Sequence, residues 1–152
     1  MWKFPHHFKQ GEKYIYVMYV YECNAILTTA KENMSDKEAI KTFKILTEDF
    51  KSRWIYPGFH FMDKEASNAL NLTMATMNIK YQLVHPSNHR AKNTERAIHT
   101  FNNHFIAGMC SVDKYIHLKL WYRLLHQATI SINLLRKSRT LTHILAYTHI
   151  FG

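Results

Sequence analysis

The stretch IKYQLVHPSNHRAKNTERAIHTFNNHFIA, residues 79–107, contains the pattern of a strand, a polar loop and a helix in succession. Ile79 to Val84 is rich in apolar, β-branched and aromatic residues, which predicts a strand. Residues 85–93 are polar and include a proline, which predicts a loop. Thr94 to Ala107 predicts a helix. Its apolar face is expected to contain Ala97, Ile98, Phe101 and Phe105.

The region before this stretch predicts a second strand and helix and, ahead of them, a longer helix. Phe59 to Met62 predicts a buried strand that ends at Asp63, and Lys64 to Met77 predicts a helix. The apolar face of this helix is expected to contain Ala69, Leu72 and Ala75 or Thr76. A helix is also expected from Ser35, which has capping-box spacing to Glu38, to about Arg53. Its apolar face is expected to contain Ile40, Phe43, Leu46 and Phe50.

The two ends of the chain complete the pattern. Lys13 to Glu22 and Ala25 to Thr29 predict two strands of a hairpin. A long helix is expected from about His117 to Lys137. Its mostly buried residues are expected to include Leu118, Trp121, Leu125, Ile132 and Leu135. Strands that alternate with helices in this order predict an α/β fold in which helices flank a mixed sheet.

The bulk composition favours one domain that binds a polyanion. The chain has 152 residues, of which 47% are hydrophobic, so a single domain over residues 1–152 with a substantial core is expected. The formal net charge is +9. An excess of this size favours nucleic acid as a partner, ahead of an anionic membrane surface.

Cysteine usage and hydropathy indicate the cellular compartment in which the chain is expected. Cys23 and Cys110 are the only cysteines, which gives neither a disulfide framework nor a CxxC metal site. A reducing compartment, nucleus or cytoplasm, is therefore expected, and secretion is not. No apolar run approaches the ~20 residues that span a bilayer.

Two carboxylates occupy positions that suit metal-dependent phosphodiester chemistry. Asp63 ends a predicted strand, and Glu95 lies at the start of a predicted helix. Such a pair could lie at one end of a sheet and hold Mg²⁺, which prefers oxygen ligands. The basic residues Arg90, Lys92 and Arg96 could contact a phosphate backbone. The alternative is that Glu95 only complements the dipole of its helix.

Other clusters suggest binding roles less specifically. His85 and His89, and His99 and His104, lack the spacing of a structural zinc site. Tyr14, Tyr16, Tyr19 and Tyr21 could stack on bases, although packing within a sheet is the expected role. Arg136, Lys137 and Arg139 form a basic cluster. This cluster could touch phosphates or complement the C-terminus of the preceding helix.

Beyond these patterns, the residues resemble the integrase catalytic cores of retrotransposons, in order along nearly the whole chain. Residues 82–90, with Asn93, Glu95–Ile98, Phe101 and Phe105, resemble the region of the family's third acid. Residues 60–67 resemble the region of the second acid. Asn24–Leu27 resembles the family's early hairpin, and residues 120–138 resemble the helix that follows the third acid.

This resemblance implies a fold, an activity and a cofactor. The fold would be ribonuclease-H-like: three antiparallel strands, then a helix, strand, helix, strand and further helices. Asp63 would be the second metal ligand and Glu95 the third, with Mg²⁺ or Mn²⁺ as cofactor. The activity would be processing of DNA 3′ ends and their transfer into target DNA. Family cores also dimerise through their helices, so a homo-oligomer is expected.

One part of the family's pattern has no counterpart in the chain. The family's first acid precedes a Phe-Pro pair, which matches Phe4-Pro5, so this acid would fall before residue 1 and the first strand is expected to be missing. Glu22 is a poor substitute, because it lies at the far end of its predicted strand. The chain as given is therefore expected to be inactive. The alternatives are a non-catalytic nucleic-acid-binding remnant and a helix-rich interaction module.

Overall fold

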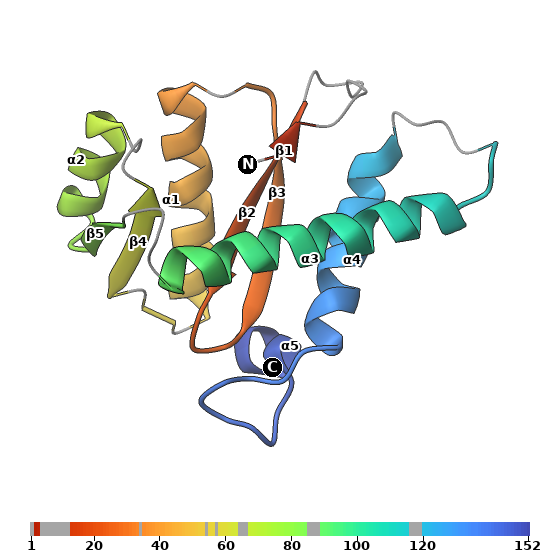
Figure 1. Ribbon diagram of the computed structural model, residues 1–152. Helices are drawn as coiled ribbons and strands as arrows, with labels where there is room; N and C mark the ends of the chain where they lie inside the picture. Colours follow the sequence, from red (N-terminus) through yellow and green to blue (C-terminus); the bar gives the residue numbers. More distant parts are fainter. Residues whose placement is uncertain are drawn as a thin grey trace. The chain divides into compact units, whose positions relative to one another are not determined.

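The computed structural model describes residues 2–3, 13–33, 35–53, 55–56, 58–63, 67–84, 89–115 and 120–152. Figure 1 shows the elements in chain order. The strands are β1 (Trp2–Lys3), β2 (Tyr14–Val20), β3 (Ala25–Lys31), β4 (Phe59–Asp63) and β5 (Lys80–Val84). The helices are α1 (Asp36–Ser52), α2 (Asn68–Thr76), α3 (His89–Ser111), α4 (Trp121–Leu134) and α5 (Ala146–Phe151).

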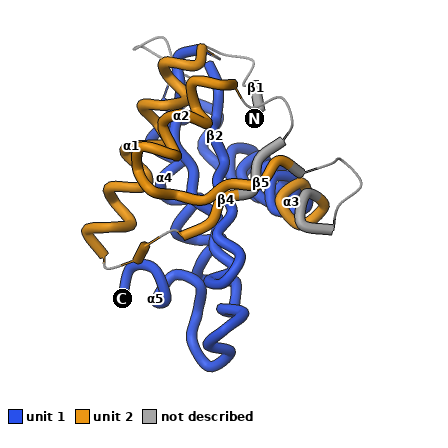
Figure 2. The backbone as a smooth tube through the Cα atoms, turned by 90° about the vertical axis from the view of Figure 1, so that its left-hand side faces the viewer, with its two compact units in different colours: residues 1–33, 96–152 blue, residues 34–95 orange. Residues whose placement is uncertain are grey.

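The fold is mixed α/β with small sheets flanked by helices, which confirms the predicted class. The described strands form an antiparallel sheet in the order β1-β2-β3 and a parallel pair, β4-β5. The chain divides into two compact units. Unit 1 contains Met1–Asn33 and Arg96–Gly152, and unit 2 contains Met34–Glu95 (Figure 2).

The antiparallel sheet of unit 1 is built on the predicted hairpin. β2 pairs with β3 over its whole length, from Tyr14 opposite Lys31 to Val20 opposite Ala25. Asn24, in the turn, has a positive φ of 55°, a conformation that asparagine tolerates better than most residues. β1 pairs antiparallel with the start of β2. A two-residue strand thus occupies the place of the first strand, which was expected to be missing.

The core of unit 1 lies between this sheet and the helices α3 and α4. Ile15 and Ile26 supply the strand side. The helices supply Ala97, Phe101, Phe105, Trp121, Leu125 and Ile132, all buried. The Phe105 ring stacks on Phe101 and meets Trp121 edge to face. The predicted apolar face of α3 is therefore confirmed at Ala97, Phe101 and Phe105.

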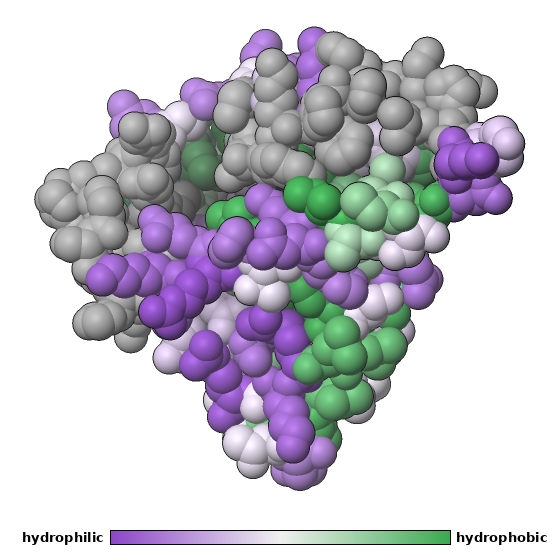
Figure 3. All heavy atoms as spheres, turned by 45° about the vertical axis from the view of Figure 1, so that its right-hand side comes forward, coloured by the Kyte–Doolittle hydropathy of each residue, from purple (hydrophilic) through white to green (hydrophobic). Residues whose placement is uncertain are grey.

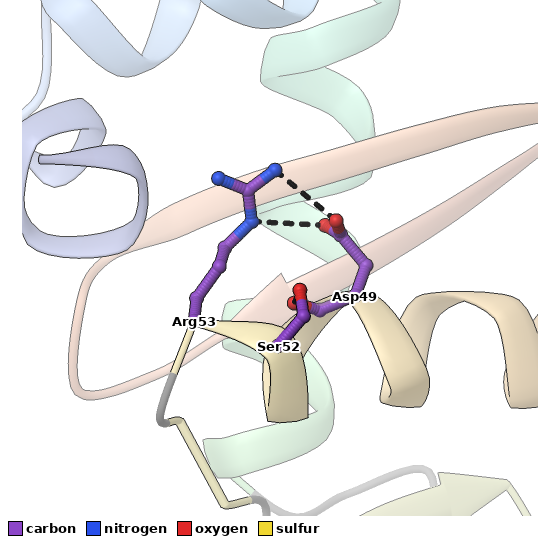
Figure 4. A network of polar contacts seen from close by, with 3 residues as sticks. All are labelled: Asp49, Ser52 and Arg53. Atoms are coloured by element: carbon purple, nitrogen blue, oxygen red, sulfur yellow. Dashed lines mark hydrogen bonds and ion pairs between the residues drawn. The ribbon is translucent and has the colours of Figure 1, made fainter.

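In unit 2, α1 forms as predicted. Ser35 caps the helix, with its Oγ accepting from the Glu38 N–H at 3.4 Å. Phe43 and Phe50 are buried at 2% and 3% exposure, which confirms the predicted apolar face. At the other end, Arg53 donates two hydrogen bonds to the Asp49 carboxylate (Figure 4). This exposed pair adds a few tenths of a kcal/mol, about the value of an i,i+4 ion pair.

Helix α2 differs from its prediction in both start and orientation. It begins after Ser67, whose Oγ accepts from the Leu70 N–H at 3.3 Å, rather than at Lys64. The predicted apolar face was wrong, because Leu72 is 68% exposed whereas Met74 is fully buried. In a helix of nine residues, the apolar residues fit a buried face that contains Leu72 as well as one that contains Met74. Tertiary packing buries the face with Met74.

The long C-terminal helix also differs from its prediction. Trp121, Leu125 and Ile132 are buried as expected, but Leu135 is 78% exposed. The helix ends at Leu134, and Leu135 caps it with a helical backbone conformation and an N–H bonded to the Ser131 carbonyl, so Leu135 lies at the exposed end of the helix. Leu118 lies outside the described residues. No helix in the described part of the chain is both long and apolar enough to cross a bilayer.

Candidate functional site

Asp63 lies at the carboxyl end of the parallel strand pair in unit 2. It is the last residue of β4 and stands in register with Val84, the last residue of β5. Neighbouring parallel strands end at the same edge of a sheet, which is where α/β proteins form their ligand sites. The backbone therefore confirms that Asp63 ends a strand, as the sequence predicted. Its side chain lies outside the described part.

Glu95 lies in the second turn of α3, and its side chain is exposed. The prediction that a loop extends to residue 93 and that Glu95 opens the helix was wrong, because α3 begins at His89. The residues that precede Glu95 in the helix are mostly polar, so they carry no apolar periodicity to reveal the extra turn. Among the described side chains, Glu95 forms no ion pair.

Arg90 and Lys92, which were predicted in a loop, belong to the same helix as Arg96. Lys92 and Arg96 are exposed and lie four residues apart, so they share a face of α3 with Glu95 between them. Arg90 is in the first turn of α3, and its side chain lies outside the described part. This face suits contact with phosphates, since it presents two cations one helical turn apart.

Glu22, weighed as a substitute acid, lies in unit 1 in the turn between β2 and β3. Its side chain is exposed. Its carbonyl oxygen accepts hydrogen bonds from the backbone N–H of Arg139 at 3.1 Å and of Thr140 at 3.3 Å. The backbone of Glu22 therefore has a structural role that links the hairpin turn to the C-terminal tail.

The described residues hold no group of three or more His, Cys, Asp or Glu side chains that could bind a metal. His99 and His104 lie on α3, whereas His85 and the side chain of His89 are outside the described part. The carboxylate of Asp63, which the sequence predicted to lie beside that of Glu95, is also outside the described part.

The tyrosines in β2 and in the turn that follows it divide between packing and surface positions. Tyr19 packs against the core of unit 1. Burial raises the pKa of Tyr16, and Lys31 Nζ lies 5.4 Å from the centre of its ring. Tyr21 remains 46% exposed, with the Arg139 guanidinium 4.5 Å above its ring.

A network of hydrogen bonds joins the hairpin to the end of α4, and neither composition nor periodicity revealed it. The Asn133 side chain bonds both backbone polar groups of Ile26. Arg136 donates from Nε to the Asn24 carbonyl at 2.7 Å and from Nη2 to Asn24 Oδ1 at 2.6 Å. Arg136 is therefore engaged within the protein, which neither reading of the basic cluster anticipated. The one signal was the resemblance, which singled out Asn24–Leu27 and residues 120–138.

No protein-family model and no curated protein matches the chain. Solved structures do. The catalytic core domain of BIV integrase is similar, with a TM-score of 0.67 and 13% identity, over 95% of this chain and 88% of that one. The HTLV-2 integrase catalytic core domain in complex with magnesium, in a dimeric form, has a TM-score of 0.64 and 14% identity over 93% and 85%.

A simian T-cell lymphotropic virus intasome in complex with the PP2A regulatory subunit B56 gamma is also similar. Its TM-score is 0.70 at 16% identity, over 97% of this chain and 51% of that one, so the chain spans about half of that relative. At these identities the similarity establishes the fold. The chain has the fold of a retroviral integrase catalytic core.

Proposed function

We propose that this chain is the DNA-binding catalytic-core domain of a mobile-element integrase, with Asp63 and Glu95 as two of its metal ligands. The observation that carries the proposal is the fold, which matches integrase cores over 93–97% of the chain. The position of Asp63 at the end of β4 and the exposure of Glu95 on α3 support it. Lys92 and Arg96, with Arg90, would neutralise backbone phosphates.

The donor set fits Mg²⁺ or Mn²⁺, because both candidate ligands are carboxylates and both belong to unit 2. Glu95 is available to a ligand, since it is exposed and forms no ion pair with a described side chain. A bound ion would stabilise charge on the attacking and leaving oxygens of a phosphodiester exchange. In the same chemistry, the cations of α3 would hold the DNA strand.

We expect strand transfer by these 152 residues to be absent or very weak. The resemblance assigns them two of the three acids, and the Glu22 turn is tied to the C-terminal tail. A catalytic centre with two acids would bind metal loosely. The second candidate function, a non-catalytic nucleic-acid-binding domain, is favoured by the net charge of +9.

Titration of a fluorescein-labelled DNA duplex in EDTA, Mg²⁺ and Mn²⁺ tests the proposal. The integrase proposal expects Mn²⁺ to strengthen binding and Glu95→Gln and Asp63→Asn to remove that effect. Glu48→Gln, at an exposed position of α1, is the matched control. A DNA affinity that is the same with and without metal and that decreases steeply as the salt concentration rises would support the non-catalytic alternative. Absence of DNA binding at low salt would refute both.

We further propose that the domain self-associates through its helices. Leu134 and Leu135, at the end of α4, are 44% and 78% exposed. Figure 3 shows a band of hydrophobic surface beside hydrophilic surface on the face turned forward. Sedimentation velocity over a range of concentrations tests this, with Leu135→Gln expected to favour the monomer. Leu72→Gln, which alters an exposed leucine of unit 2, is the control; an equal effect would contradict a role for α4.

A further inference from the structure

Arg139 is held in a fixed position at the surface of unit 1. Its Nε donates to Tyr19 Oη at 3.1 Å, and its guanidinium carbon lies 4.5 Å above the centre of the Tyr21 ring. Its backbone N–H donates to the Glu22 carbonyl at 3.1 Å. Two contacts therefore orient the side chain and a third holds the backbone, whereas an arginine side chain on most protein surfaces is free to rotate.

The hydroxyl that holds Arg139 is itself fixed. Tyr19 Oη donates to Asn24 Oδ1 at 2.9 Å, which leaves its lone pairs to accept from Arg139. Asn24 Oδ1 also accepts from Arg136 Nη2, and Asn24 Nδ2 donates to the Lys137 carbonyl. Arg139 thus belongs to a continuous network of hydrogen bonds that includes the side chain of Arg136 and the backbone carbonyl of Lys137.

The terminal nitrogens of Arg139 are available for an anion. Among the described residues, neither Nη1 nor Nη2 has a hydrogen-bond partner, and the side chain is exposed. Glu22, the acid in the adjacent turn, forms no ion pair with Arg139. A guanidinium bonded at Nε and stacked on an aromatic ring still presents the paired donors that bind a phosphate.

The sequence around this arginine is strongly cationic. Residues 114–152 contain six Lys or Arg and no Asp or Glu. They thus supply six of the nine excess positive charges. Lys137 and His143 are exposed in the same segment as Arg139. This excess of positive charge in the segment favours a polyanionic partner.

We propose that Arg139, positioned by Tyr19 and Tyr21, binds a backbone phosphate of DNA. The proposal rests on the proposed function, because it assumes that the domain binds DNA. It adds a contact formed by unit 1 residues alone, in addition to the cations of α3. Lys137 supplies further charge, and the exposed part of the Tyr21 ring offers an apolar surface to a neighbouring sugar or base.

Titration of a fluorescein-labelled DNA duplex with the 152-residue chain, at several salt concentrations, tests the contact. Arg139→Gln should weaken binding about three- to tenfold and reduce the salt slope by about one. Arg123→Gln is the matched control, since Arg123 is an exposed arginine beside a tyrosine, 5.9 Å from the Tyr122 ring. The control should change the affinity less than about twofold.

Tyr19→Phe separates orientation from charge, because it keeps every cation and removes only the hydroxyl that holds Nε. It should weaken binding about twofold to threefold and leave the salt slope unchanged. Arg139→Lys should fall between the wild type and Arg139→Gln, since lysine keeps the charge and loses the paired donors. Thermal unfolding of each variant verifies the fold, and these two conservative changes preserve the test if Arg139→Gln unfolds.

If Arg139→Gln and Arg123→Gln bind DNA with equal affinity, the Arg139 contact is wrong. The proposed function still stands in that case, provided that the wild type binds DNA. No binding by the wild type at low salt would overturn both. Inorganic phosphate, at matched ionic strength, tests the source of the anion. If phosphate stabilises the wild type and not Arg139→Gln, while both bind DNA equally, the site is one for free phosphate and the DNA assignment is wrong.

Discussion

The side chain of Asn133 takes the place of a neighbouring strand for Ile26. The Ile26 N–H donates to Asn133 Oδ1 at 2.9 Å, and Asn133 Nδ2 donates to the Ile26 carbonyl at 2.7 Å. Asn133 is fully buried, and it lies on α4, which packs against β3. The primary amide satisfies both backbone groups where a strand would otherwise be required.

Asn133→Ala should lower the free energy of unfolding by about 2–4 kcal/mol, because it leaves a buried N–H and a buried carbonyl without partners. Urea unfolding, followed by tryptophan fluorescence or circular dichroism, measures the change. Asn103→Ala, at an exposed position of α3, should stay within about 0.5 kcal/mol. Similar values for the two variants would show that the Asn133 bonds contribute little.

Met74→Ala and Leu72→Ala form a matched pair that reports which face of α2 is buried. Met74 is fully buried, so its truncation should cost about 2–5 kcal/mol through lost burial and a cavity. Leu72 is 68% exposed, and its truncation should cost less than about 0.5 kcal/mol. Chemical denaturation of both variants checks this. The reverse order would support the face that periodicity suggested.

His60 should make unit 2 less stable in acid. Its ring meets Phe43 edge to face with centroids 5.3 Å apart, and burial lowers its pKa from the ordinary value of 6.5. The unfolded chain therefore binds a proton more readily than the folded one as the pH falls below 6.5. The stability of the fold with a neutral His60 is therefore fully present above pH 6.5. It is lost as the pH falls through the lower pKa that His60 has in the folded protein.

Unfolding midpoints measured across the acid range check the His60 prediction. His60→Phe should flatten the acid limb, because phenylalanine keeps the ring contact and cannot take up a proton. His126→Gln, at an exposed position of α4, should leave the limb unchanged. An acid limb of unchanged slope in His60→Phe would assign the acid sensitivity to other groups.

The two thiols should react at very different rates. Cys23 is buried, and burial, with a smaller effect of the nearby Glu22 charge, raises its pKa to about 11. Only the thiolate is nucleophilic, so about a thousandth of Cys23 is in the reactive form at about pH 8. Cys110 is exposed. Ellman's reagent should therefore label one thiol quickly and the second only in urea. Cys110→Ser should abolish the fast phase.

The elements that the sequence predicted best are those whose burial follows local periodicity. Phe43 and Phe50 in α1, and Phe101 and Phe105 in α3, recur at helical spacing and are buried. Local periodicity did not determine which face of α2 is buried, because Leu72 and Met74 both fit an apolar pattern. Tertiary packing decided between them. At Leu135 the helix ended one residue too early for the pattern to hold.

The candidate site was predicted in part. The end of β4 at Asp63 followed from a short apolar run, whereas the start of α3 at His89 did not, because its first turns lack apolar residues. The bonds between Asn133 and Ile26 join positions 107 residues apart. A hydrogen bond between a side chain and a backbone group that far apart cannot be predicted from the spacing of residues along the sequence. Here only a resemblance between whole segments pointed to both partners.

The division of the chain has a consequence for its synthesis. Unit 2 is one continuous segment, whereas unit 1 joins the first residues to the last. Ile26 leaves the ribosome long before Asn133 does, so the backbone groups of Ile26 that bond Asn133 stay unsatisfied while residues 34–132 emerge. Contacts this distant form slowly. We therefore expect vectorial folding in which unit 2 becomes structured first and the hairpin of β2 and β3 is the segment that most needs protection until α4 has been synthesised.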